Sequence, residues 1–301
     1  MNKQLLGIDW GTSNRRAYLV DASGACLRRH ADDQGMLACA GRFPQALAAL
    51  LAELGLDGAT PVVISGMAGS AQGWQEAPYL DGAVALADLG SHLVPVQGAG
   101  RAGRTAIVPG YCMRGPLVDV MRGEETQLLG ALLLGQPDGW VVLPGTHSKW
   151  VLLEDGRVNR WSTFMTGELF SALSAGGTLA PLINHAGALD GGAGFEAGLA
   201  LARDRLPLSQ ALFSIRARVV TGLLEPALAR SCVSGLLIGA EFAACEKQGA
   251  GAGPLALLGS SQLCQRYGQA ARYFGRAVTM PDPDAAYCAA LGHFLRQEAL
   301  E

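Results

Sequence analysis

The sequence is poor in charge and almost devoid of lysine. Only 16% of its 301 residues are charged, the net charge is −3, and lysine occurs only at positions 3, 149 and 247. A surface that binds duplex nucleic acid usually carries a strong basic excess, so this balance argues against a nucleic-acid partner. Half of the residues are hydrophobic, which is enough for a large core and argues against extended disorder.

Paired cysteines and long apolar runs are also missing. The seven cysteines include no C-x-x-C pair, so neither a disulfide framework nor a zinc site is indicated, and thiols in a reducing compartment are expected. The longest apolar run, around LLGALLLG, is too short to span a membrane. Asp9 interrupts the apolar stretch that a signal peptide would need. We therefore expect a cytoplasmic protein with no membrane partner.

The segment LLGIDWGTSNRRAYLV, residues 5–20, predicts a β-hairpin. Asp9 ends its first apolar strand, where a carboxylate is costly unless something pairs with it. Gly11, Thr12 and Ser13 supply a tight turn whose amides and hydroxyls suit a phosphate. Taken alone, the segment fits an ordinary hairpin with a polar turn equally well.

A second copy of this layout lies at WVVLPGTHSKWVLLEDGRVNRWSTF, residues 140–164. An apolar strand, a loop at Gly145–Ser148, a strand, the turn Asp155-Gly156 and a third strand follow one another. Such a duplication is more specific than either copy alone. It predicts a mixed α/β protein of two facing domains with a cleft between them, which we divide at residues 1–115 and 116–301.

The remaining segments predict the elements around these hairpins. RFPQALAALLAELG predicts a helix with Pro44 near its start and Gly55 at its end. TPVVISG and LALLGSS predict buried strands, the second leading into a helix, and Asp282-Pro283 start the last helix. GAGRAG, residues 98–103, matches G-x-G-x-x-G but precedes a strand, so we expect a loop without a nucleotide.

The segment MRGEETQLLGALL places Glu124 and Glu125 in the first turn of an apolar helix. The helix dipole alone favours acids there. Alternatively, one of them accepts the proton of a substrate hydroxyl, which is typically worth about a hundredfold to ten-thousandfold in rate. Arg122 suits an anionic group, or forms a surface salt bridge.

Three further segments carry candidate ligands of a polar substrate. In SGMAGSAQGWQEAPY, the set Gln72, Trp74, Glu76 and Tyr79 fits stacking and hydrogen bonding to a polyol, although a buried tryptophan anchor is as ordinary. Thr166 and Glu168 start a helix, where capping is the default explanation. Lys149 ends the second loop, where it contacts a phosphate or sugar acid, or simply edges a strand.

Together these motifs carry a family resemblance. GIDWGTSNRRAYLV, RGEETQLLGA, LPGTHSKWV and LLGSSQLCQRYGQA resemble the first phosphate loop, catalytic-acid segment, second phosphate loop and adenosine segment of the sugar-kinase, actin and heat-shock superfamily. VISGMAGS is similar to a strand of xylulokinases. With QGWQEAPY, FMTGELF and GLLIGAEFA, the chain from residue 5 to about 290 resembles the 2-dehydro-3-deoxygalactonokinase family.

The resemblance implies two ribonuclease H-like domains closing over an ATP cleft, and transfer of the γ-phosphoryl group to the 6-hydroxyl of 2-keto-3-deoxy-galactonate in galactonate breakdown. Asp9 would hold Mg²⁺, and Glu124 would be the base, with Glu125 as second choice. The implied ATP ligands are Gly11, Thr12, Ser13, Gly145, Thr146, His147, Ser148, Gly259 and Ser260. The implied substrate ligands are Arg15, Arg16, Met67, Gln72, Trp74, Lys149, Thr166 and Glu168. Arg122 would be a further catalytic residue and a candidate to meet the substrate carboxylate.

The match has departures, and alternatives stay open. The broader sugar kinases have an aspartate where this chain has Glu124-Glu125, and small residues where it has His147 and Lys149. A kinase for another small sugar or sugar acid, and an inactive sugar-sensing relative, are the alternative functions. The Ala/Leu-rich helices of the C-terminal third fit a homodimer interface as well as a core.

Overall fold

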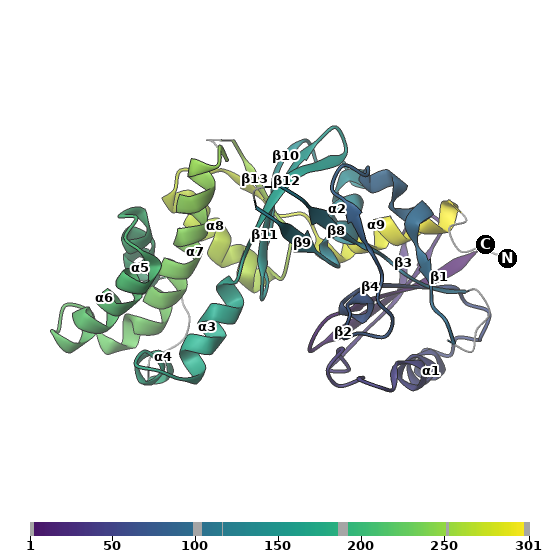
Figure 1. Cartoon of the computed structure of the whole chain (residues 1–301), viewed down its shortest axis with the longest axis horizontal. Coiled ribbons are helices and arrows are strands. Elements are labelled where there is room, and N and C mark those ends of the chain that lie inside the picture. Colours follow the sequence, from purple (N-terminus) through teal and green to yellow (C-terminus); the bar gives the residue numbers. More distant parts are fainter. Residues whose placement is uncertain (1–2, 99–103, 116, 186–191, 251–252, 298–301) are drawn as a thin grey trace. The chain divides into compact units, whose positions relative to one another are not determined.

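The computed structural model describes residues 3–98, 104–115, 117–185, 192–250 and 253–297. The chain forms two compact units, which are described separately (Figure 1). Unit 1 comprises residues 1–138, 153–160 and 282–301, and unit 2 comprises residues 139–152 and 161–281. Residues 116–138 and the C-terminal helix therefore belong to unit 1. The division drawn from the sequence, at residues 115 and 116, had assigned them to the second domain.

Unit 1 is built on a six-stranded sheet in the order β3-β2-β1-β4-β7-β6. Its strands are β1 (Gln4–Trp10), β2 (Arg15–Asp21), β3 (Cys26–Asp32), β4 (Val62–Gly66), β6 (Val94–Pro95) and β7 (Thr105–Ile107). The predicted hairpin is confirmed, since β1 pairs antiparallel with β2. On its other side β1 pairs parallel with β4, so the carboxyl ends of both strands lie at one edge.

The other elements of unit 1 cover this sheet and extend it. They are α1 (Phe43–Glu53), α2 (Glu124–Leu133), α9 (Pro283–Arg296), the 3-10 turns η1 (Met67–Gly69) and η2 (Leu86–His92), and a small sheet of β5 (Tyr79–Asp81), β8 (Gly110–Met113) and β9 (Asp119–Met121). Helix α9 packs on α2, β1 and β2, which explains why the C-terminus belongs to unit 1. Asp282 caps α9, as predicted, by accepting the amides of Asp284 and Ala285.

Unit 2 contains a sheet in the order β12-β11-β10-β13-β14. The strands are β10 (Gly139–Leu143), β11 (Ser148–Glu154), β12 (Arg157–Phe164), β13 (Leu255–Leu257) and β14 (Val278–Thr279). A three-strand meander is again followed by parallel strands on its first-strand side. This order matches β3-β2-β1-β4-β7 of unit 1, so the duplication predicted from the two hairpins is confirmed.

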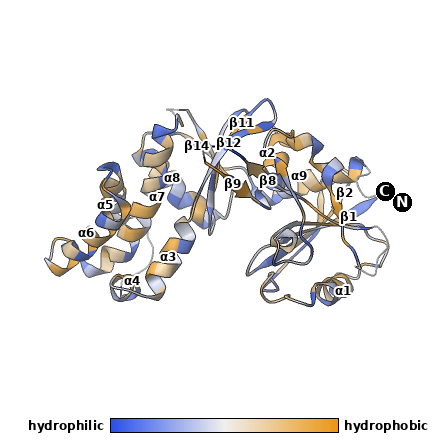
Figure 2. Cartoon of the chain, viewed as in Figure 1, coloured by the Kyte–Doolittle hydropathy of each residue, from blue (hydrophilic) through white to orange (hydrophobic). Residues whose placement is uncertain are grey.

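Helices make up the rest of unit 2. They are α3 (Thr166–Ala175), α4 (Ala180–His185), α5 (Ala193–Arg203), α6 (Leu208–Val220), η3 (Pro226–Leu228), α7 (Ala229–Lys247) and α8 (Ser261–Tyr273). Helix α7 packs along α5 and is hydrophobic over most of its length (Figure 2). The segment Pro226–Lys247 is long and apolar enough to cross a membrane, which the sequence analysis overlooked. However, 78% of its apolar window is buried within the fold, as expected of a core helix.

The predicted helix at residues 42–55 and the strand–turn–helix at residues 255–273 are also confirmed, as α1, β13 and α8. Strand β7 follows the GAGRAG motif as expected. Residues 99–103 of that motif lie outside the described residues. All seven cysteines lie in the described part of the chain as thiols; Cys26 is exposed and the other six are buried.

Candidate functional site

Asp9 of unit 1 lies where β1, β4 and α2 meet. Its Oδ2 atom pairs with the guanidinium of Arg16 at 2.5 Å. Gly66, the last residue of β4, has φ +86°, and a Cβ there would lie 3.4 Å from Asp9 Oδ1 and 2.8 Å from the carbonyl oxygen of Trp10. A Cβ on Gly123 would lie 3.2 Å from Cα of Gly66. The missing side chains thus let the turn before Glu124 approach Asp9 and leave room beside Oδ1.

The first loop, Gly11–Ser13, is hydrogen-bonded to the segment that follows β3. Met36 and Leu37 donate their amides to the carbonyls of Gly11 and Thr12 at 2.8 and 3.1 Å. Gly11 N–H bonds to Asn14 across the turn. Thr12 and Ser13 are exposed, so their side chains are available to a ligand. We call Asp9, this loop, Gly66 and Glu124 the unit 1 cluster.

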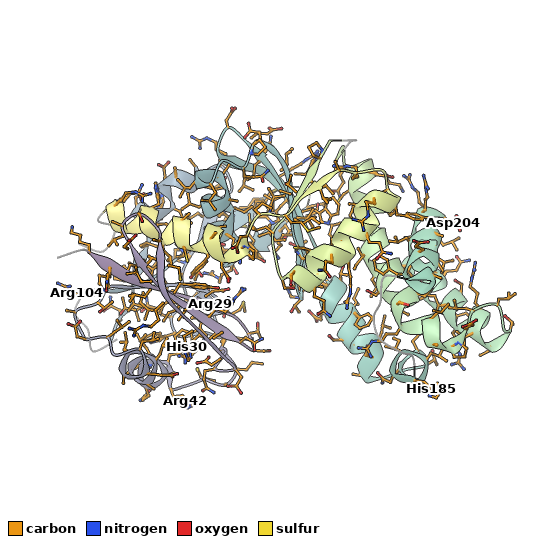
Figure 3. The ribbon with its side chains drawn as sticks, turned by 180° about the vertical axis from the view of Figure 1, so that it is seen from behind. Arg29, His30, Arg42, Arg104, His185 and Asp204 are labelled. Carbon is orange, nitrogen blue, oxygen red and sulfur yellow. The ribbon has the colours of Figure 1, made fainter. Side chains whose placement is uncertain are left out.

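The two arginines after this loop differ in surroundings. Arg15 is buried, pairs with Asp32 at 2.5 Å and donates to the carbonyl of Ala46 at 3.1 Å. His30, labelled in Figure 3, also contacts Asp32 at 3.0 Å. Arg15 is therefore a structural residue that joins β2 to Asp32 and Ala46 inside unit 1. Arg16, with 38% of its side chain exposed, stays beside Asp9.

The adjacent acids of α2 have opposite environments. Glu125 is 0% exposed, and both of its oxygens lie 2.8 Å from the amide of Gly123, which donates to them. Burial, and secondarily the charge of Glu124, raise the pKa of Glu125 to about 8. Glu124 is only partly buried, and its carboxylate accepts the amide of Arg122 at 3.0 Å.

The side chain of Arg122 fastens the turn before α2 to the segment 77–79. Its Nη2 atom donates to the carbonyl of Ala77 at 2.8 Å, and its guanidinium lies 4.3 Å from the ring centroid of Tyr79. The Nε and Nη1 atoms are buried without a hydrogen-bond partner. Tyr79, which the sequence offered for stacking on a polyol, thus stacks on the Arg122 guanidinium.

The three other unit 1 candidates lie on and after η1. Met67, directly after Gly66, and Trp74 are both partly buried, and Gln72 is exposed. Trp74 stacks on Phe43 with ring centroids 5.9 Å apart and meets Trp10 edge-on at 6.3 Å. Trp74 is therefore a packing anchor of this loop, the alternative that the sequence left open.

In unit 2 the second loop, Gly145–Ser148, meets α3 and the turn after β13. A Cβ on Gly167 would lie 2.6 Å from the carbonyl oxygen of Gly145. Glu168 donates its amide to the carbonyl of Thr146 at 3.0 Å. A Cβ on Gly259 would lie 3.3 Å from the carbonyl oxygen of Pro144. We call this loop, the start of α3, and Gly259-Ser260 the unit 2 cluster.

Side chains of the second loop point in two directions. Thr146 and His147 are exposed, and Nε2 of His147 lies 2.5 Å from a carboxylate oxygen of Glu168. Ser148 is buried, and its hydroxyl lies 2.6 Å from that of Tyr267. Lys149 is also buried, at 5% exposure. The loop thus offers a ligand its Gly145–His147 part, while Ser148 and Lys149 face inward.

A pocket opens beside the unit 2 cluster. It lies between the second loop, the start of α3, and helices α7 and α8. Its lining residues are Gly145, Thr166, Gly167, Phe170, Ser234, Leu237, Ile238, Leu263, Arg266 and Tyr267. The sequence analysis named only Gly145 and Thr166 as ligands. The α7 residues of the pocket, Ser234, Leu237 and Ile238, could not be identified as ligand contacts from the sequence, because an apolar stripe on a helix is equally typical of a core.

The duplicated sheets and the loops at their strand ends define the class of the protein. It has the two-unit α/β fold of the sugar-kinase, actin and heat-shock superfamily. Component A of the (R)-2-hydroxyglutaryl-CoA dehydratase of Acidaminococcus fermentans shares this fold, with a TM-score of 0.54 at 13% identity over 99% of both chains.

The family follows from closer relatives. The chain belongs to the 2-keto-3-deoxy-galactonokinase family, whose model matches residues 9–294. It is 38% identical to the "Probable 2-dehydro-3-deoxygalactonokinase" of Rhizobium meliloti, over 94% of both chains. It is 36% identical to the 2-dehydro-3-deoxygalactonokinase of Escherichia coli, over 97% of both chains. A crystal structure of a "putative 2-dehydro-3-deoxygalactonokinase protein" from Sinorhizobium meliloti has a TM-score of 0.90 at 37% identity, covering 98% of this chain and 96% of that one. The predicted family is confirmed.

Proposed function

We propose that this protein transfers the γ-phosphoryl group of ATP to the 6-hydroxyl of 2-keto-3-deoxy-galactonate, as a cytoplasmic enzyme of galactonate breakdown. Membership of the family supports the reaction. The observation that carries the chemistry is the approach of Glu124's turn to Asp9 through Gly66 and Gly123. Under this proposal Glu124 and Asp9 act within unit 1 as the base and the phosphate-side carboxylate of an in-line phosphoryl transfer.

We assign Glu124 as the general base. The substrate hydroxyl attacks the γ-phosphorus while its proton passes to the Glu124 carboxylate, and the bond to the β-phosphate oxygen breaks to release ADP. Glu125 does not suit this role. A carboxyl with a pKa of about 8 is largely protonated at neutral pH, and its 0% exposure keeps it from a substrate.

For ATP we assign the two loops and the unit 2 pocket. Thr12 and Ser13 of unit 1 and Gly145–His147 of unit 2 would bind phosphates through amides and hydroxyls. The pocket has mostly apolar walls with a few polar groups, which suits a purine base. Gly259 and Ser260, at the turn before α8, would contact the adenosine.

Asp9 suits a Mg²⁺ ion. Mg²⁺ usually takes one or two carboxylates and completes its shell with waters and substrate phosphates. The described residues contain no cluster of three or more metal-ligating side chains, which this mode of binding does not need. Asp9 Oδ1, beside the space kept open by Gly66, is the atom we assign. When bound, the ion would neutralise charge on the phosphates.

The sugar acid needs a cation for its carboxylate. Arg15 and Arg122 are occupied within unit 1 by Asp32 and Ala77. We therefore retain Arg16 in unit 1, which keeps 38% of its side chain exposed, as the candidate. Lys149 in unit 2 is buried and faces inward, so we do not assign it to the substrate carboxylate. Met67, Gln72, Thr166 and Glu168 remain candidate contacts to the substrate, while Trp74 would act by holding its loop.

The test is coupled ADP release with ATP and Mg²⁺, comparing 2-keto-3-deoxy-galactonate, its gluconate epimer and neutral hexoses. We expect turnover that strongly favours the galactonate compound. Turnover with another sugar alone would keep the kinase and discard the substrate. ATP binding without turnover on any sugar would support the inactive sugar-sensing alternative.

A further inference from the structure

A buried acid interrupts the apolar core helix of unit 2. Glu241 lies on α7 within the sequence SGLLIGAEFAAC and is 1% exposed. Burying a carboxylate is costly unless hydrogen bonds satisfy it. Glu241 belongs to the GLLIGAEFA segment, to which no chemical role has been assigned, and it does not line the pocket.

Three donors from three different elements converge on Glu241. Its Oε2 accepts the indole N–H of Trp150 on β11 at 2.7 Å. Its Oε1 accepts the hydroxyl of Tyr267 on α8 at 2.6 Å and that of Thr166 at the start of α3. Because Tyr267 donates its only hydroxyl proton to Glu241, Ser148 must donate to Tyr267 across their 2.6 Å contact.

These partners are parts of the unit 2 cluster or its walls. Thr166 and Tyr267 line the pocket, and Ser148 ends the second loop. A hydrogen bond to a charged group is worth more than a neutral one, and a buried donor left unpaired is costly. Loss of the carboxylate would therefore release the loop, α3 and α8 from one another at the same time.

We propose that Glu241 is a positioning residue for ATP: through Thr166, and through Tyr267 to Ser148, it fixes the second phosphate loop and the two helices that wall the base pocket. This inference rests on the proposed function, because it assigns the pocket and loop to ATP. A merely structural carboxylate would support the stability of unit 2 without a specific effect on nucleotide affinity.

Two replacements of Glu241 distinguish these roles. Glu241→Gln keeps the shape and can keep the bonds: its carbonyl accepts from Trp150, and its amide donates to Thr166 and Tyr267, whose hydroxyl then turns to Ser148. Glu241→Leu leaves all three donors unpaired. The matched control is Phe242→Leu, which loosens the same core, where Phe242 packs on Trp150 at 4.8 Å between ring centroids, and touches no bond of the network.

The measurement is ATP affinity by titration calorimetry on the full chain, without sugar acid, alongside thermal unfolding. We expect Glu241→Leu to bind ATP about tenfold or more weakly, and Glu241→Gln and Phe242→Leu to stay within about threefold of wild type. Wild-type affinity in a folded Glu241→Leu protein would overturn the proposal. So would an equal loss in Phe242→Leu, or no rescue by Glu241→Gln. Absence of ATP binding by the wild type would overturn the proposed function as well.

If Glu241→Leu does not fold, Tyr267→Phe takes its place. We expect Tyr267→Phe to weaken ATP binding, since the bridge to Ser148 is lost. Wild-type ATP affinity in a folded Tyr267→Phe protein would overturn the proposal.

Discussion

Replacing Glu125 by glutamine tests whether Glu125, at the start of α2, is buried in its neutral form. The pKa of Glu125 is raised to about 8 from an ordinary value of 4.5, chiefly by burial. An acid whose folded-state pKa is raised contributes stability below its unfolded pKa, and that stability is lost as pH rises through the folded pKa. Each pKa unit corresponds to about 1.4 kcal/mol, so ionising Glu125 costs the folded state about 4–5 kcal/mol by pH 8.

The assay is urea unfolding of wild type and Glu125→Gln at pH 5, 6.5 and 8. We expect the variant to gain stability relative to wild type as pH rises, by about 3 kcal/mol or more between pH 5 and 8. The pKa of Glu241, raised to about 7 by burial, gives both proteins the same additional slope, which cancels in the difference. The exposed Glu76→Gln is the matched control. A difference that does not change with pH would refute the assignment of a neutral, buried Glu125.

Further predictions concern residues of unit 1. Glu124→Gln should lower kcat by about a hundredfold to ten-thousandfold with ATP affinity by calorimetry unchanged; near-normal turnover would contradict its role as base. Arg15→Met should cost about 3 kcal/mol of unfolding free energy in urea, because it leaves the Asp32 carboxylate without its buried partner, and an unchanged midpoint would contradict this. Gly66→Ala should lower the unfolding free energy by about 1–2 kcal/mol, given φ +86° and the 2.8 Å approach to Trp10. It should also raise the Mg²⁺ concentration needed for half-maximal turnover, and an unchanged Mg²⁺ requirement would argue against Asp9 as the ligand.

Much of the architecture could be predicted because it is local in sequence. Each hairpin has alternating or apolar strands joined by a polar turn. The repeat of that layout predicted two domains built on the same meander, and the two sheets share the order of their first five strands. The grouping of α9 with unit 1 could not be predicted in this way. It depends on packing between residues about 270 positions apart, such as the hydrogen bond from Tyr18 to Asp284 at 2.6 Å.

Side-chain direction was the main obstacle at the candidate site. The sequence analysis placed Ser148 at the end of the second loop and Arg15 just after the first loop, and the backbones of both residues lie there. Whether each side chain faces the ligand or the core depends on partners that are distant in sequence, here Tyr267 and Asp32. A lone acid in an apolar helix, as at Glu241, was the available signal for a buried network, and the sequence analysis did not use it.

Under the proposed function, the two acids of α2 would have different roles. Successive residues of a helix point about 100° apart, so only one of two adjacent carboxyls can face the core while the other stays near the solvent. Burial raises the pKa of Glu125 to about 8, so Glu125 is mostly uncharged at neutral pH. A second carboxylate next to Glu124 would add negative charge close to the transferred phosphoryl group, where charge is already concentrated. A neutral Glu125 avoids this repulsion and still accepts the amide of Gly123, at the turn that approaches Asp9. The paired glutamates, where sugar kinases have an aspartate, therefore fit one base and one neutral support better than two alternative bases.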